Sequence, residues 1–143
     1  MSVRENIASN IVTQLQAISS PTIKLVTREP FDFDKLSNAQ YPAILVRTTN
    51  ESREDATVGG AASSRFGNID YELVCFVKST TIDTSRNQIV EAIEEKLDVD
   101  RTRGGNAIDT QITSIETDDG SIAPRGGVII TVRVEYQFTR GTT

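Results

Sequence analysis

Histidine and cysteine, which carry much of the acid–base and nucleophilic chemistry of enzymes, are nearly missing from this sequence. None of the 143 residues is a histidine, and Cys75 is the single cysteine. Without histidine, Ser–His and Cys–His nucleophile pairs cannot form, and most zinc and iron sites lose their commonest ligand. One thiol makes neither an intrachain disulfide nor a multi-thiolate metal site. The composition therefore argues against an enzyme and fits a reducing cytosol.

Two pairs of aspartates are the remaining candidates for acid–base or metal chemistry. Asp98 and Asp100 lie two residues apart, and Asp118 and Asp119 are neighbours. A calcium loop of the EF-hand kind needs acidic residues at several alternate positions and a closing glutamate, and the sequence lacks that spacing. We therefore expect these aspartates to form turns and end helices, and we predict no metal site.

The glycine pairs and the single thiol also lack the context of a catalytic or cofactor site. The pairs at 59–60, 104–105 and 126–127 occur in no phosphate-binding motif, so they indicate flexible loops and turns. Cys75 alternates with Leu73 and Val77 on an apolar strand face, where burial makes a thiol inert. We predict no catalytic residue and no cofactor.

The charge balance is acidic, with 15 Lys and Arg against 20 Asp and Glu and a formal net charge of −5. This argues against broad binding of nucleic acid through its phosphates. Three arginines lie in segments predicted to be loops, where they could contact a phosphate or an acidic partner: Arg101, Arg103 and Arg125. No aromatic residues interleave with them, so ordinary solvated charge is the favoured interpretation.

Two amphipathic helices are predicted from apolar spacings of three and four. The first runs from Val3 to Ile18, with Ser2 and Glu5 at the spacing of a capping box, and ends at 19–21. The second is capped by Asp83, carries its apolar stripe from Arg86 to Leu97, and exposes Glu91, Glu94 and Glu95 on its other side.

Five strands are predicted around these helices. They are a short strand over 23–27, an apolar run over 43–48, a long alternating strand over 66–78, a weaker strand over 108–116 and a strand of strict alternation over 128–139. Residues 50–65 show no apolar periodicity and are predicted to be a long, mobile loop. We expect the strands on either side of it to form a hairpin that carries this loop away from the core.

The predicted order is α-β-β-β-α-β-β, in a single domain spanning 1–143. The fold class is α+β, with a mixed or antiparallel sheet of about five strands and two helices packed on one face. The N-terminal residues lack the apolar run of a signal peptide, and no stretch is long and apolar enough for a membrane span. We therefore expect a soluble protein inside the cell.

The pattern resembles the tail terminator, or tail completion, proteins of long-tailed bacteriophages. It consists of an N-terminal helix beginning SVRENI at 2–7, the strand YPAILV at 41–46, a long loop, the strand YELVCFV at 71–77, the helix IVEAIEEKL at 89–97 and the strand VRVEYQF at 132–138. The resemblance implies a homohexameric ring in the virion, at the junction of tail and neck, with the tail tube and the head connector as partners. Such a ring stops tube growth, and DNA passes through it without sequence-specific binding.

Two alternatives stay open: another phage neck or head–tail connector subunit, and an intracellular dimeric binding module. The residues expected to contact subunits or partners are Arg53, Glu54 and Asp55 in the loop over 50–65, and Arg101 and Arg103 in the loop after the second helix. Val74 and Phe76 share a strand face with Asp70 and Glu72, so we also expect a protein partner to cover that end of the strand.

Overall fold

The computed structural model of the protein describes residues 2–32, 35–55, 64–120, 124–139 and 141. Neither α-helix of this described chain combines the length and apolar character needed to span a bilayer. The elements follow one another as α1 (Val3–Gln16), β1 (Leu25–Thr27), the 3-10 helix η2 (Asn38–Gln40), β2 (Ala43–Asp55), β3 (Ser64–Lys78), α2 (Ile82–Val99), β4 (Asp109–Thr117) and β5 (Arg125–Thr139).

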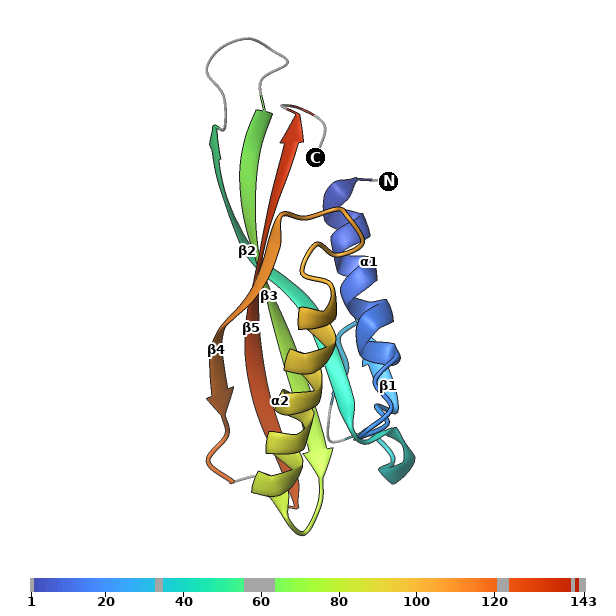
Figure 1. The fold of residues 1–143 in the computed structure, drawn as a ribbon. Coiled ribbons are helices and arrows are strands. Elements are labelled where there is room, and N and C mark those ends of the chain that lie inside the picture. The colour runs from blue at the N-terminus through green and yellow to red at the C-terminus, as the bar shows by residue number, and fades with distance from the viewer. Residues whose placement is uncertain (1, 33–34, 56–63, 121–123, 140, 142–143) are drawn as a thin grey trace.

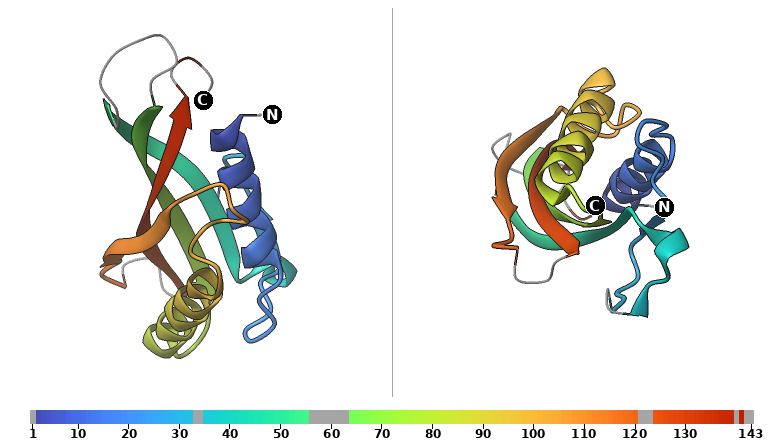
Figure 2. Two further views of the ribbon diagram at one scale, coloured as in Figure 1. Left: turned by 45° about the horizontal axis from the view of Figure 1, so that its top comes forward. Right: turned by 90° about the horizontal axis from the view of Figure 1, so that it is seen from below.

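The strands form one five-stranded mixed sheet in the order β1-β2-β3-β5-β4. β1 runs parallel to β2, and every other neighbouring pair is antiparallel. The sheet curls around α1 and α2, which lie together on its concave face (Figures 1 and 2). The predicted α+β class, the element order and the helices on one face are confirmed.

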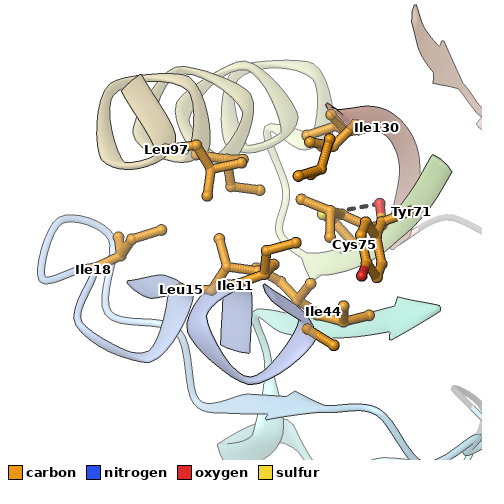
Figure 3. Packing of buried hydrophobic residues seen from close by; sticks show 14 of the residues in the cluster. Ile11, Leu15, Ile18, Ile44, Tyr71, Cys75, Leu97 and Ile130 are labelled. Atoms are coloured by element: carbon orange, nitrogen blue, oxygen red, sulfur yellow. Dashed lines mark hydrogen bonds between the residues drawn. The ribbon is translucent and has the colours of Figure 1, made fainter. Parts of the chain in front are cut away.

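The core fills the space between the concave face and the two helices (Figure 3). Ile11 and Leu15 of α1 and Leu97 of α2 meet the inward side chains of the sheet, such as Ile44 and Ile130, and all five are buried. Every second residue of β5 points inward, which is the period-2 pattern read from the sequence. A helix stripe and an alternating strand thus bury each other's apolar surface.

Cys75 lies in this core, as the sequence predicts. Its side chain is buried, and the Sγ hydrogen donates to the carbonyl of Leu73 at 3.5 Å. Burial raises the pKa of the Cys75 thiol, because the thiolate would lose its hydration. The residue therefore packs as a small apolar side chain and remains a protonated thiol.

The predicted loop over 50–65 is wrong at both of its ends. β2 continues to Asp55 and β3 begins at Ser64, so Arg53, Glu54 and Asp55 lie on a strand; residues 56–63 fall outside the described chain. The hairpin itself is confirmed, with antiparallel pairing that reaches Asp55 opposite Arg65. Polar residues extend as strands here because the backbone hydrogen bonds come from pairing with a neighbouring strand and not from local apolar alternation.

The predicted N-terminal capping of both helices also differs, although α1 begins at Val3 as predicted. The N-cap of α2 is Thr81, and Asp83 lies within the first turn, where it pairs with Arg86 at 3.4 Å. Ser2 does cap α1, accepting from the Glu5 amide at 3.1 Å, but the Glu5 carboxylate turns outward to Arg28 instead of closing a capping box. Carboxylates prefer an arginine within reach to a single backbone amide, because two charges then attract.

Arg103 is the largest departure from the expected solvated loop, since its side chain is fully buried. Its Nη2 donates to the carbonyl of Leu97 at 2.5 Å and to that of Asp100, so the guanidinium caps the C-terminal turn of α2. The free carbonyls of a helix end carry partial negative charge, which a cation stabilises. Burial lowers the pKa of Arg103, although the charges of Asp100 and Asp98 oppose this shift.

We therefore expect Arg103→Ala to lower the free energy of unfolding by about 2–4 kcal/mol, because two carbonyls lose a charged donor and the side chain leaves a cavity. Urea denaturation followed by circular dichroism measures this. Arg101→Ala is the matched control: Arg101 is exposed and pairs with Asp109 at 2.7 Å. An exposed pair of this kind contributes about 0–1 kcal/mol, so equal losses in the two variants would contradict the capping role.

Candidate subunit interface

A three-stranded arm extends past the ends of both helices (Figure 1). We define the arm as residues 51–55 of β2, 64–69 of β3 and 134–139 of β5. β3 is its central strand, with Asp55 opposite Arg65 on one side and Arg65 opposite Phe138 on the other. The arm thus continues the sheet from its base at Ile69 and Val134, which still belong to the core, to strand ends that reach past the helical layer.

The arm has open strand edges on both sides within the described chain. β1 pairs with β2 only at Ala43–Leu45, and β4 pairs with β5 only as far as Glu135. Open edges present unpaired amides and carbonyls that another strand can bind, and charged residues and bulges limit indiscriminate pairing. β2 has both safeguards, a register shift between Thr48 and Asn50 and several charged side chains beyond it. The edges therefore suit a selective partner.

Glu51 is the hub that fixes the arm to the body. Its carboxylate accepts from Arg4 Nε of α1 at 2.7 Å, from Tyr136 OH of β5 at 2.9 Å, and from Arg53 Nε of its own strand. Burial raises the pKa of Glu51, but the hydrogen bonds from Arg53, Tyr136 and Arg4 outweigh it, so the net shift is downward. The carboxylate therefore stays ionised and joins α1, β2 and β5.

An aromatic surface supports this hub. The rings of Tyr136 and Phe138 stack with centroids 5.3 Å apart, and the Arg53 guanidinium lies 4.7 Å from the centre of the Phe138 ring. Between β2 and β5 stands Gly67, and a Cβ there would lie 2.5 Å from Cε1 of Tyr136. The glycine thus makes the space through which the Tyr136 ring crosses β3 to reach Glu51.

The structure brings Arg53, Glu54 and Asp55 together at the far end of β2. Arg53 faces the aromatic surface, Asp55 pairs with Arg65 at 2.9 Å, and Glu54 is exposed. Glu54 accepts no hydrogen bond or ion pair from the described residues. Of the three, Glu54 is thus the side chain whose charge the described chain leaves uncompensated.

Arg101 and Arg103 lie in a second place, the turn that follows α2. Asp100 shapes this turn by accepting from the Thr102 hydroxyl at 2.6 Å, the Gly104 amide at 2.8 Å and the Thr102 amide at 2.9 Å. These bonds lower the pKa of Asp100 to about 2. Arg101 remains at the surface, whereas the buried Arg103 holds the turn in place. Their predicted contacts with subunits or partners stay a prediction.

The predicted turn chemistry of the aspartates is confirmed at Asp118 as well. Its carboxylate accepts from Arg86 Nη1 at 3.0 Å, from the Gly120 amide at 2.6 Å and from the Gly127 amide. Within the described chain, no group of three or more His, Cys, Asp and Glu is placed to hold a metal ion.

The convex face of the sheet carries a shallow apolar hollow of about 310 Å³. Val74 and Phe76 line it together with Ile129 of β5, and all three are half-buried. Phe31 covers part of this end, its ring meeting the Phe76 ring edge-on with centroids 5.9 Å apart. The loop after β1 therefore covers part of the apolar face for which the sequence analysis expects a protein partner.

Sequence reasoning missed Arg4, Glu51, Gly67 and Tyr136 as a connected group. The one local signal was Gly67, which interrupts a long alternating strand and so marks a close approach. The rest could not be found locally, because Glu51 and Tyr136 are 85 residues apart. Only the pairing of β2 and β5 with β3 brings them together.

The comparisons with known proteins add structural likeness but no family. No protein-family model matches the chain, and no curated protein matches it. A chain in a solved structure described as the virion of a native gene transfer agent particle aligns with a TM-score of 0.49 and 10% identity. The alignment covers 96% of this chain and 92% of that one.

Glu51→Gln tests the hub. At neutral pH we expect it to lower the free energy of unfolding by about 1–3 kcal/mol, because three donors lose their charged acceptor. Since the folded pKa of Glu51 lies below the ordinary value of 4.5, its contribution is complete above that value and is lost as the pH falls through the folded pKa. The gap between wild type and variant should therefore narrow in acid, as measured by urea denaturation from pH 7 to pH 3. Glu94→Gln, at an exposed position of α2, is the control and should change little at any pH.

Gly67→Ala tests the crossing of the Tyr136 ring. The added methyl group displaces the ring from Glu51, and we expect a loss of about 1–3 kcal/mol in thermal or urea unfolding. Asn68→Ala changes the next residue of β3, on the opposite face, and should stay within about 0.5 kcal/mol of wild type. A Gly67→Ala protein as stable as Asn68→Ala would show that the ring has room to spare.

Proposed function

We propose that this protein is a structural, non-enzymatic subunit of a bacteriophage tail. In this role it forms a ring, expected to be hexameric, on the end of the tail tube, stops tube polymerisation and presents a surface to the head connector. The observation that carries the proposal is the arm, a three-stranded extension of the sheet that, within the described chain, has open edges and reaches past the helices. The sequence resemblance to tail terminator proteins, quoted above, gives the arm this role.

The arm supports a ring for a geometric reason. A closed ring needs two different surfaces on each subunit, one binding the other around an axis. A projecting arm with open edges can reach the body of the next copy or the tube, and its anchorage at Glu51 keeps its direction fixed. A flexible segment loses conformational entropy when it becomes ordered on binding, whereas a preformed strand avoids most of that cost.

The exposed side of α2 supports passage of DNA through the ring. Glu91, Glu94 and Glu95 are exposed there, and none of them accepts a hydrogen bond or ion pair from the described chain. Unpaired carboxylates repel phosphates, so DNA does not adhere to a surface that carries them. In the proposed ring, DNA passes through without binding to this surface.

The experiment mixes the purified protein with tail tubes polymerising from their tube protein and follows them by negative-stain electron microscopy. We expect rings at one tube end and a narrow length distribution, because capped tubes cannot grow. Glu54→Lys reverses the uncompensated charge of the arm and should lower the fraction of capped tubes several-fold. Glu94→Lys makes the same reversal on α2 and should leave capping intact.

Several results would count against the proposal or against the contact at Glu54. Wild-type protein that leaves tube ends bare and tube lengths unchanged contradicts a terminator, and binding to the head connector alone would indicate a neck subunit instead. A stable dimer that ignores tube ends would favour the binding module. If both charge reversals behave alike, the contact lies away from Glu54.

A further inference from the structure

A polar hollow of about 210 Å³ lies where the N-terminal end of α1 meets the sheet, beside the base of the arm. Arg4 and Glu5 of α1, Arg28 from the segment after β1, and Tyr71 of β3 line it. Three segments distant in the sequence therefore converge on one small space. Neither the fold nor the hub at Glu51 requires this hollow.

Tyr71 marks the hollow as more than a gap in the packing. The residue is only 1% exposed, yet its hydroxyl makes no hydrogen bond with any described residue. The hydroxyl oxygen is not one of the fully buried polar atoms that lack a partner, so it opens onto the hollow and can bond to a group there. Since Tyr71 lines the hollow, the missing partner is a group that enters it.

Several further donors around the hollow remain unused within the described chain. Arg4 gives only its Nε to Glu51, and Arg28 gives only its Nη1 to Glu5, which leaves both Nη groups of Arg4 and the Nε and Nη2 of Arg28. The first turn of a 14-residue helix adds the amides of Val3 and Arg4, which have no intrahelical acceptor. Acceptors are therefore what the hollow lacks.

The charged groups around the hollow also favour an anionic ligand. Two arginines and one carboxylate, Glu5, line the hollow. Arg28 pairs with Glu5 at 2.6 Å, and Arg4 pairs at 2.7 Å with Glu51, which does not line the hollow. The positive end of the α1 dipole then favours an anion in it. A neutral or cationic guest would leave these donors unsatisfied, whereas an oxyanion accepts from several of them at once.

We propose that this hollow binds an oxyanion group, a phosphate or a carboxylate, which accepts from the Tyr71 hydroxyl and from Arg4 and Arg28. The group comes either from a free anion or from an acidic side chain of a second copy of this chain. The site does not depend on the ring: a lone subunit contains all of its donors.

Titration of the protein with sodium phosphate, at constant ionic strength set with sodium chloride, tests the site. We expect saturable shifts of the Val3 and Arg4 amide signals in 15N NMR spectra. Tyr71→Phe removes one oxygen from an otherwise unchanged ring and should weaken phosphate binding about tenfold, as should Arg28→Gln. Glu5→Gln frees Arg28 and removes the repelling carboxylate, so it should tighten binding, an effect that simple damage to the fold would not produce.

Arg47→Gln is the matched control, since Arg47 pairs with Glu72 at 2.5 Å on the convex face, away from the hollow. It should bind phosphate as wild type does. Shifts that grow linearly with phosphate, or that are equal in Tyr71→Phe, Arg28→Gln and Arg47→Gln, would overturn the site. Tyr71→Phe is expected to fold normally, which its unfolding curve verifies.

A second measurement distinguishes the two sources of the oxyanion. If an acidic side chain of a second copy occupies the hollow, phosphate weakens self-association in sedimentation velocity, and Tyr71→Phe weakens it too. If the ligand is a free anion, phosphate binds with equal affinity to dilute and associated protein. Either result requires saturable phosphate binding, which does not depend on ring formation. A failure to form rings would therefore count against the proposed function and leave this test valid.

Discussion

The carboxylate of Glu51 is the point on which the position of the arm depends. It is the only group in the described chain that receives donors from α1, β2 and β5 together, through Arg4, Arg53 and Tyr136. A charged acceptor with three donors offsets the loss of its hydration, whereas one with a single donor would not. The same interaction therefore anchors the arm, sets the angle of the N-terminal end of α1 and keeps the hollow beside it open. If the carboxylate were removed, the arm would keep its strand pairing but lose its fixed direction.

The concave face of the sheet changes character along its length, and this change separates the body from the arm. Beneath the helices its inward residues are apolar, as at Leu73 and Ile130. Beyond the helices the same face bears the aromatic surface of Tyr136 and Phe138 and the charges of Glu51 and Arg53. Aromatic rings shield the sheet from water where no helix does so, and the polar groups at their edges remain partnered. One sheet thus serves as half of a core at one end and as a self-supporting extension at the other.

The sequence predicts the parts of this protein that local periodicity controls. The stripe of α1, the alternation of β5 and the burial of Cys75 follow from which residues are apolar and how they are spaced. The sequence predicts a loop in place of the β2 part of the arm, because residues 51–55 are polar on both faces and only their pairing with β3 makes them a strand. The sequence predicts a solvated Arg103, because its carbonyl partners lie at the C-terminal end of α2 and the spacing of apolar residues does not fix the exact residue at which that helix ends. The hub and the hollow were out of reach for the same reason, since they join residues distant in the chain. Of the expected contact residues, Arg53, Glu54 and Asp55 do share one end of the molecule, a grouping that follows from their adjacency alone.

The distribution of charge limits how two copies can meet. Arginines of the sheet are largely neutralised within the chain, as in the pairs Arg47–Glu72 and Arg133–Asp70. The acidic side chains of α2 are not, so much of the net charge of −5 gathers on one exposed helix face. Two such faces placed together would repel each other, and the repulsion would be strongest at low ionic strength. Contacts through the arm reduce that cost, because most of the charges there, such as those of Glu51, Arg53 and Asp55, are paired within the chain and the strand edges supply hydrogen bonds of their own. A ring held by its arms would therefore leave the α2 faces turned away from one another, toward solvent or toward DNA.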